Sequence, residues 1–113
     1  MKNKTVEEKK GVGEIKLYTL THCRYCNTLK EALSHLGVPY RDINVESAKH
    51  SLLGDWLEEN LKTESYPIIH LEKYPGESIY IISKTNLEKL NGVRIFTTID
   101  QALEILLNYY YEI

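Results

Sequence analysis

The chain carries only two cysteines, and both belong to the segment Cys23-Arg24-Tyr25-Cys26. This segment lies where a strand-like pattern of apolar residues gives way to a helical one. Cysteines at this spacing can close a small ring. At a helix start, unpaired backbone N–H groups and the helix dipole favour thiolate over thiol. We therefore interpret the pair as a redox dithiol at a strand-to-helix junction. The alternative, a buried pair that merely fills space, stays open.

The size and charge of the chain describe one ordinary folded domain. It has 113 residues, a formal net charge of −2 and 27% charged residues, with no basic block that would suit nucleic acid or an anionic membrane. Its apolar runs are far shorter than the roughly 20 residues of a membrane-spanning helix. No cysteine outside the pair is left for the disulfide framework of a small secreted domain. We expect a cytoplasmic monomer with neither nucleic-acid nor membrane partners.

The N-terminal segment bears on the domain boundary, and the histidines bear on metal binding. Residues 1–13 are rich in lysine and glutamate and lack the apolar stretch of a signal peptide. We expect them to form a flexible tail, followed by one domain over residues 14–113. The four histidines show no spacing typical of zinc ligands, and two cysteines alone do not complete a tetrahedral site. We expect no bound metal.

The first part of the domain predicts a strand, a helix and a second strand. Residues 14–20 have strand-like content and end at the cysteines. The apolar residues of one helical face then follow in steps of three and four: Cys26, Leu29, Leu33 and Leu36. Gly37 ends this helix, and residues 40–45 alternate as a short strand does.

The middle of the chain predicts a helix and a hairpin. The helix covers residues 48–61, with Ser47 as its N-cap. Its inner face is expected to carry the apolar residues at helical spacing: Ala48, Leu52, Trp56, Leu57 and Leu61. Residues 68–71 and 78–83 form an antiparallel hairpin around a turn at 74–77.

The C-terminal part predicts two more helices. Residues 85–91 form a short helix that Gly92 ends, and residues 93–97 are a β-rich link without an assigned state. Thr97 or Thr98 caps the last helix. The inner face of that helix carries five residues: Ile99, Ala102, Leu103, Leu106 and Tyr110. The order β-α-β-α-β-β-α-α predicts a mixed sheet with helices on both faces, because β-α-β units need right-handed crossovers.

This order, with Cys-x-x-Cys after the first strand and a proline opening the third, resembles the thioredoxin fold. Within that fold the chain resembles the glutaredoxins, from about residue 14 to the C-terminus. The compact domain, the tyrosine between the cysteines and the segment Ser65-Tyr66-Pro67 carry the resemblance. It implies an α/β thioredoxin-like fold with a four-stranded mixed sheet, helices on both faces and an extra C-terminal helix.

The resemblance also implies a thiol–disulfide oxidoreductase. Cys23 is the expected nucleophile because it lies at the helix start, and Cys26, on the apolar face, is expected to resolve the mixed disulfide. Tyr66 and Pro67 resemble the cis-proline loop that faces the dithiol in this fold. Such a loop presents its backbone to an extended peptide such as glutathione.

Other residues near the pair are expected to bind substrate. Arg24 can pair with a carboxylate of glutathione or of a protein, and Tyr25 offers a ring and a hydroxyl group. Thr85 and Asn86 can hold a carboxylate at a helix start. His22 can stabilise the thiolate of the next residue. The alternatives are solvated side chains and, for Thr85 and Asn86, a simple N-cap.

The chain departs from the glutaredoxin pattern at three places. Arg24 stands where the family usually has proline, and its cation favours a thiolate at the neighbouring cysteine. Leu20 stands where a basic residue is expected. The region Ile82-Ser83-Lys84-Thr85-Asn86 lacks the family's glycine pair, which lets the backbone approach glutathione closely.

Three functions follow from these residues. The first is a dithiol oxidoreductase that reduces protein disulfides or glutathione mixed disulfides, with glutathione or a thioredoxin reductase-type enzyme as reductant. The second is a [2Fe–2S] cluster-binding module, since some glutaredoxins without the motif proline hold a cluster between two protomers. The third is an interaction domain that has kept the fold and lost redox activity.

Overall fold

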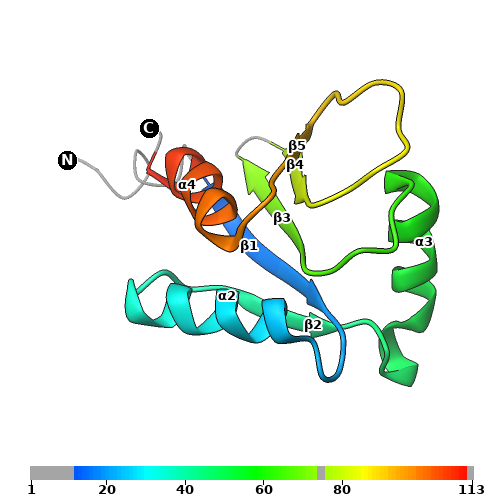
Figure 1. Cartoon of the computed structure of the whole chain (residues 1–113), viewed down its shortest axis with the longest axis horizontal. Helices are drawn as coiled ribbons and strands as arrows, with labels where there is room; N and C mark the ends of the chain where they lie inside the picture. Colours follow the sequence, from blue (N-terminus) through cyan, green and yellow to red (C-terminus); the bar gives the residue numbers. More distant parts are fainter. Residues whose placement is uncertain (1–11, 74–75, 112–113) are drawn as a thin grey trace.

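The computed structural model describes residues 12–73 and 76–111, which form one sheet with helices on both sides (Figure 1). In chain order the elements are β1 (Val12–Thr19), α2 (Arg24–His35), β2 (Arg41–Asn44), the short 3-10 helix η1 (Ala48–His50), α3 (Ser51–Leu61), β3 (Ile68–Lys73), β4 (Glu77–Ile82), β5 (Val93–Ile95) and α4 (Ile99–Tyr110). The strand β1 begins two residues before its predicted start. The predicted tail otherwise lies outside the described residues, as do Tyr74 and Pro75 of the predicted turn.

The sheet has five strands in the order β2-β1-β3-β4-β5. β1 pairs in parallel with β2 and antiparallel with β3. β4 pairs antiparallel with β3 and in parallel with β5. The predicted mixed sheet and the hairpin are confirmed, but the predicted number of four strands is wrong. The fifth strand comes from the β-rich link, in which Val93 pairs with Tyr80 and Ile95 with Ile82.

The helix predicted over residues 85–91 is absent, and α4 is the one helix that follows β4 in the described chain. The start of the segment is tied to the end of α3 by hydrogen bonds, and this competes with helix formation there. The Thr85 hydroxyl donates to the Leu61 carbonyl, and the Asn86 N–H donates to the Lys62 carbonyl at 3.0 Å. Gly92 then leads into β5 with a φ of 71°.

The two faces of the sheet are covered by different helices (Figure 1). Leu29 and Leu33 of α2 pack with Ala102 and Leu106 of α4 in one hydrophobic core cluster against β1, β3 and β4. The other face packs against α3, chiefly through Leu57 and Leu61. Both sheet faces are therefore buried against helices, as the resemblance implied.

The predicted inner face of α2 is right for its first three residues. Cys26, Leu29 and Leu33 are each 0% exposed. Leu36 is 51% exposed, because it is the C-cap residue, beyond the last helical turn. Gly37 ends the helix as predicted, with a φ of 72° that favours glycine.

The predicted inner face of α3 is partly wrong. Leu57 and Leu61 are buried, whereas Leu52 is 81% and Trp56 50% exposed. The cause is Gly54, where an added Cβ would lie 3.0 Å from the Cβ of Val45. The helix approaches the chain after β2 through this glycine, which turns Leu52 and Trp56 outward. Ser47 precedes η1 and makes no side-chain capping bond there.

Candidate active site

The two cysteines lie at the junction of β1 and α2 and are joined by a disulfide bond, with their Cα atoms 5.2 Å apart. Cys23 is the N-cap residue of α2, with extended backbone, and Cys26 lies in the first turn. The sulfur of Cys23 accepts the backbone N–H of Cys26 at 3.1 Å. This sulfur therefore stands at the positive end of the helix dipole, which favours a thiolate.

The two cysteines differ in their exposure to solvent. Cys26 is completely buried, whereas Cys23 is partly exposed. An external disulfide therefore has access to Cys23 and not to Cys26. His22, directly before the pair, is exposed and has a φ of 60°, in the left-handed region that residues with side chains rarely adopt.

Arg24 and Tyr25 are exposed residues at the start of α2, and Tyr25 is 64% exposed. They line a pocket of about 620 Å³ together with Ser83, which follows β4, and with the start of α4. The hydroxyl of Thr98 caps α4 by accepting the Gln101 N–H at 3.1 Å. The start of α2 thus shares a pocket with the start of α4.

Tyr66 and Pro67 lie directly before β3, and the peptide bond between them is cis. Pro67 is buried. The Tyr66 hydroxyl donates to Glu58 Oε2 at 2.8 Å, so its ring is directed toward α3. Burial and the Glu58 carboxylate both raise the pKa of the Tyr66 hydroxyl. The hydroxyl is engaged by the protein itself, which leaves a substrate role to the backbone.

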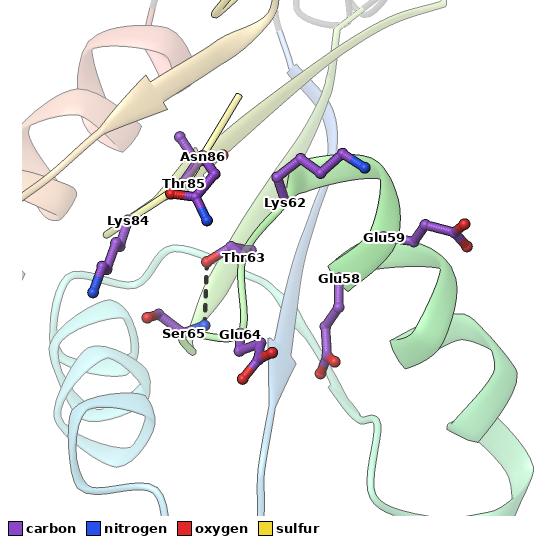
Figure 2. A pocket seen from close by; sticks show the side chains of 9 residues that line it. All are labelled: Glu58, Glu59, Lys62, Thr63, Glu64, Ser65, Lys84, Thr85 and Asn86. Carbon is purple, nitrogen blue, oxygen red and sulfur yellow. Dashed lines mark hydrogen bonds between the residues drawn. The ribbon is translucent and has the colours of Figure 1, made fainter. Parts of the chain in front are cut away.

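Thr85 and Asn86 line a second pocket, of about 720 Å³, between the end of α3 and the segment after β4 (Figure 2). Lys62, Lys84 and Ser65 also line it, as do three glutamates: Glu58, Glu59 and Glu64. Ser65 is held by its N–H, which donates to the Thr63 hydroxyl at 3.2 Å. The pocket therefore offers both cationic and anionic groups directly beside the Tyr66–Pro67 loop.

The sequence profile of the family described as Glutaredoxin matches residues 15–73, which include the cysteine pair and the Tyr66–Pro67 loop. This match covers more than half of the chain. The chain belongs to the glutaredoxin family. No curated protein sequence matches it.

Solved structures agree with this glutaredoxin assignment at the level of the fold. A mutant of the thioredoxin-like protein BC3987 is 20% identical, with a TM-score of 0.51, over 82% of this chain and 99% of its own. The holo form of glutaredoxin C1 from Populus tremula x tremuloides is 18% identical, with a TM-score of 0.53, over 95% of this chain and 79% of its own. These likenesses show that this glutaredoxin has a thioredoxin-like fold.

The predicted substrate residues of this glutaredoxin do not all line one pocket. Arg24 and Tyr25 line the pocket shared with α4, whereas Thr85 and Asn86 line the pocket beside α3. The neighbouring residues Ser83 and Lys84 each line one of the two pockets. The segment after β4 therefore borders both.

Sequence reasoning missed several of the residues that line these pockets. Lys84 was noted only as part of a segment without glycine, although a lysine there is a signal for an anionic ligand. Thr97 and Thr98 are predicted as helix caps and not as residues that line a pocket with Arg24. No sequence spacing reveals this shared pocket, because Arg24 and the two threonines are more than 70 residues apart along the chain.

Residues 12–73 and 76–111 contain no group of three or more His, Cys, Asp or Glu side chains that is arranged to hold a metal ion. No helix in the same part of the glutaredoxin is long and apolar enough to cross a membrane.

Proposed function

We propose that this glutaredoxin is a thiol–disulfide oxidoreductase that reduces protein disulfides or glutathione mixed disulfides. The observation that carries the proposal is the cysteine pair at the start of α2, with one sulfur accessible and the other buried. In the dithiol form, the same geometry gives an accessible nucleophile and a resolving thiol within bonding reach.

The reaction transfers two electrons from the Cys23–Cys26 dithiol to a substrate disulfide. The Cys23 thiolate attacks one substrate sulfur, a mixed disulfide forms, and the other substrate sulfur leaves as a thiolate that takes up a proton. Cys26 then loses its proton and attacks the Cys23 sulfur. The Cys23–Cys26 disulfide forms, and the second substrate sulfur leaves. Two molecules of glutathione, oxidised to glutathione disulfide, return both electrons and restore the dithiol.

The start of α2 supports the charge of the nucleophile. The Cys26 N–H donates to the Cys23 sulfur at 3.1 Å, and the first N–H groups of a helix have no partner within the helix. Arg24 adds a cation at the next residue in the chain. These groups stabilise a thiolate more than a thiol, so attack proceeds at neutral pH.

Glutathione carries two carboxylates and one ammonium group, and the two pockets contain groups that suit them. Lys84 beside the Tyr66–Pro67 loop and Arg24 beside the disulfide can each pair with a carboxylate. Glu64 lines the same pocket as Lys84 and can accept the ammonium group. Thr85 and Asn86 stay predicted ligands, although their backbone and hydroxyl groups already bond to the end of α3.

The experiment is reduction of a small glutathione mixed disulfide, coupled either to glutathione or to a thioredoxin reductase, with wild type and Cys23→Ser. We expect turnover with glutathione that is lost in Cys23→Ser. Turnover only with the reductase would instead identify a thioredoxin-like donor. No turnover with either would contradict the proposal and direct attention to the [2Fe–2S] and redox-silent alternatives, which iron content after anaerobic purification separates.

A further inference from the structure

The turn that delivers the chain to Cys23 has an unusual backbone. Thr21 and His22 form a turn between β1 and α2, and His22 has a φ of 60°. Residues with side chains adopt this conformation only where their surroundings hold them in it. Contacts of the turn must therefore stabilise the left-handed backbone conformation of His22.

These contacts are a closed ring of three hydrogen bonds that joins the turn to the chain at the end of β2. The Thr21 N–H donates to Glu46 Oε1 at 2.7 Å. The Glu46 N–H donates to Asn44 Oδ1 at 2.8 Å. The Asn44 side-chain amide donates to the Thr21 hydroxyl at 3.1 Å, which closes the ring. Hydrogen bonds linked in this way strengthen one another.

The ring continues the pairing of β1 and β2 beyond the ends of both strands. Thr19 pairs with Asn44 in the sheet, and the Val45 N–H donates to the Thr19 carbonyl at 3.0 Å. The Ser47 hydroxyl donates to the Asn44 carbonyl at 3.0 Å, which braces the other side of the ring. The chain is thereby tied to β2 up to two residues before the nucleophile.

We propose that Asn44 and Glu46 are positioning residues for Cys23. By holding the Thr21–His22 turn, they keep the Cys23 sulfur at the start of α2, where Cys26 can reach it. The proposal rests on the thiol–disulfide function proposed above and concerns its resolving step. Loss of the ring lowers the effective concentration of Cys26 toward the Cys23 sulfur, because proximity of this kind depends on restricted motion.

Geometry and charge can be separated at Glu46. Glu46→Gln removes the negative charge but keeps a carbonyl oxygen that can accept the Thr21 N–H. Glu46→Ala removes both, and Asn44→Ala breaks the ring while it keeps the charge. A positioning role predicts that the two alanine variants behave alike and that the glutamine variant resembles wild type.

A matched control lies at the opposite end of the same two strands. There Arg41 of β2 donates to Glu14 of β1 at 3.1 Å, so Glu14→Ala removes a comparable bond between exposed side chains. All three bonds of the ring also lie at the surface, so each variant is expected to fold. Thermal unfolding of all variants checks this.

The decisive measurement is the equilibrium between the dithiol and disulfide forms in a thiol redox buffer. We expect the equilibrium constant for closing the disulfide to fall about tenfold in Glu46→Ala and Asn44→Ala, the size of one lost hydrogen bond. Glu46→Gln should stay within about threefold of wild type, and Glu14→Ala should not change. Turnover with a protein disulfide should fall in parallel, with more enzyme held as mixed disulfide.

The outcomes distinguish this inference from the function on which it rests. If wild type does not turn over disulfides, the proposed function fails, while the redox equilibrium still tests the ring. If the equilibrium in Glu46→Ala and Asn44→Ala equals that in Glu14→Ala, the positioning role is wrong. If Glu46→Gln shifts as far as Glu46→Ala, the carboxylate acts through its charge, and the role proposed here is also wrong.

Discussion

The two sides of the disulfide are built differently. On the side of the nucleophile, β1 leads into α2 at the cysteine pair, as the apolar pattern predicted, through a turn that is held by hydrogen bonds. On the opposite side, residues 83–86 after β4 contain no glycine and bond to the end of α3, and the chain then passes through an added strand before α4 begins. The difference suggests that reactivity depends on the first side and substrate choice on the second, so variants on the two sides should have separable effects.

The largest effect is expected on the nucleophile side, at the resolving cysteine. Cys26→Ser should lower the rate of protein-disulfide reduction at least about 100-fold, because the mixed disulfide on Cys23 has no internal thiol to displace it. Intact-mass spectrometry should show the enzyme linked to its substrate. Full activity in Cys26→Ser would mean that one cysteine suffices and that the pair is not used as a dithiol.

The next largest effect is expected on the substrate side, at Thr85. Its hydroxyl donates to the Leu61 carbonyl and accepts the Leu87 N–H at 3.0 Å. Thr85→Val should lower the free energy of unfolding by about 1–3 kcal/mol and raise KM for glutathione more than it lowers kcat. Thr85→Ser keeps the hydroxyl and is the control. An unchanged KM would separate this segment from glutathione binding.

A smaller effect is expected at Thr98, where α4 begins beside Arg24. Thr98→Ala removes the N-cap and should lower the free energy of unfolding by about 1 kcal/mol, whereas Thr98→Ser should not. Urea titration of both variants measures this. The dithiol–disulfide equilibrium of the cysteine pair should be the same in Thr98→Ala as in wild type, because we expect it to depend on the nucleophile side alone. A changed equilibrium would show that the two sides are coupled.

The smallest effect concerns β3, which follows the Tyr66–Pro67 loop. Its buried His70 bonds through Nδ1 to the Tyr18 hydroxyl and through Nε2 to the Ser78 hydroxyl, both at 3.0 Å. Burial lowers the pKa of His70 below its ordinary value of 6.5. His70 therefore binds a proton more readily in the unfolded chain than in the folded one. The stability that neutral His70 contributes is present above pH 6.5 and is lost as the pH falls below it.

Urea unfolding at neutral and mildly acidic pH tests this sign. Wild type should lose up to about 1 kcal/mol between about pH 7 and about pH 5.5, and His70→Gln should lose less. Equal losses in the two proteins would show that His70 does not titrate differently in the folded state.

The fold was largely predictable because its strongest signals are local. The change of period at Cys23, the glycine at residue 37 and the proline at residue 67 each mark a boundary that the structure confirms. The missed elements depend on contacts between distant segments. Trp56 follows a helical spacing, yet it faces outward because Gly54 and not Trp56 approaches Val45.

The candidate site divides in the same way. The cysteines were found from their spacing, whereas the second pocket depends on bonds from residues 85 and 86 to the end of α3. The spacing of apolar residues along the chain does not predict such bonds. Asn44 and Glu46 were likewise missed, because their partner Thr21 is more than 20 residues away along the chain.

The outward position of Trp56 has a consequence for optical measurements on this protein. It is the only tryptophan in the chain, it is half exposed, and its helix covers the sheet face opposite α2. Its fluorescence is therefore expected to report the docking of α3 and to be insensitive to whether the disulfide is open or closed. A redox titration of this protein needs a thiol-specific label, while tryptophan emission remains free to follow unfolding in the same sample.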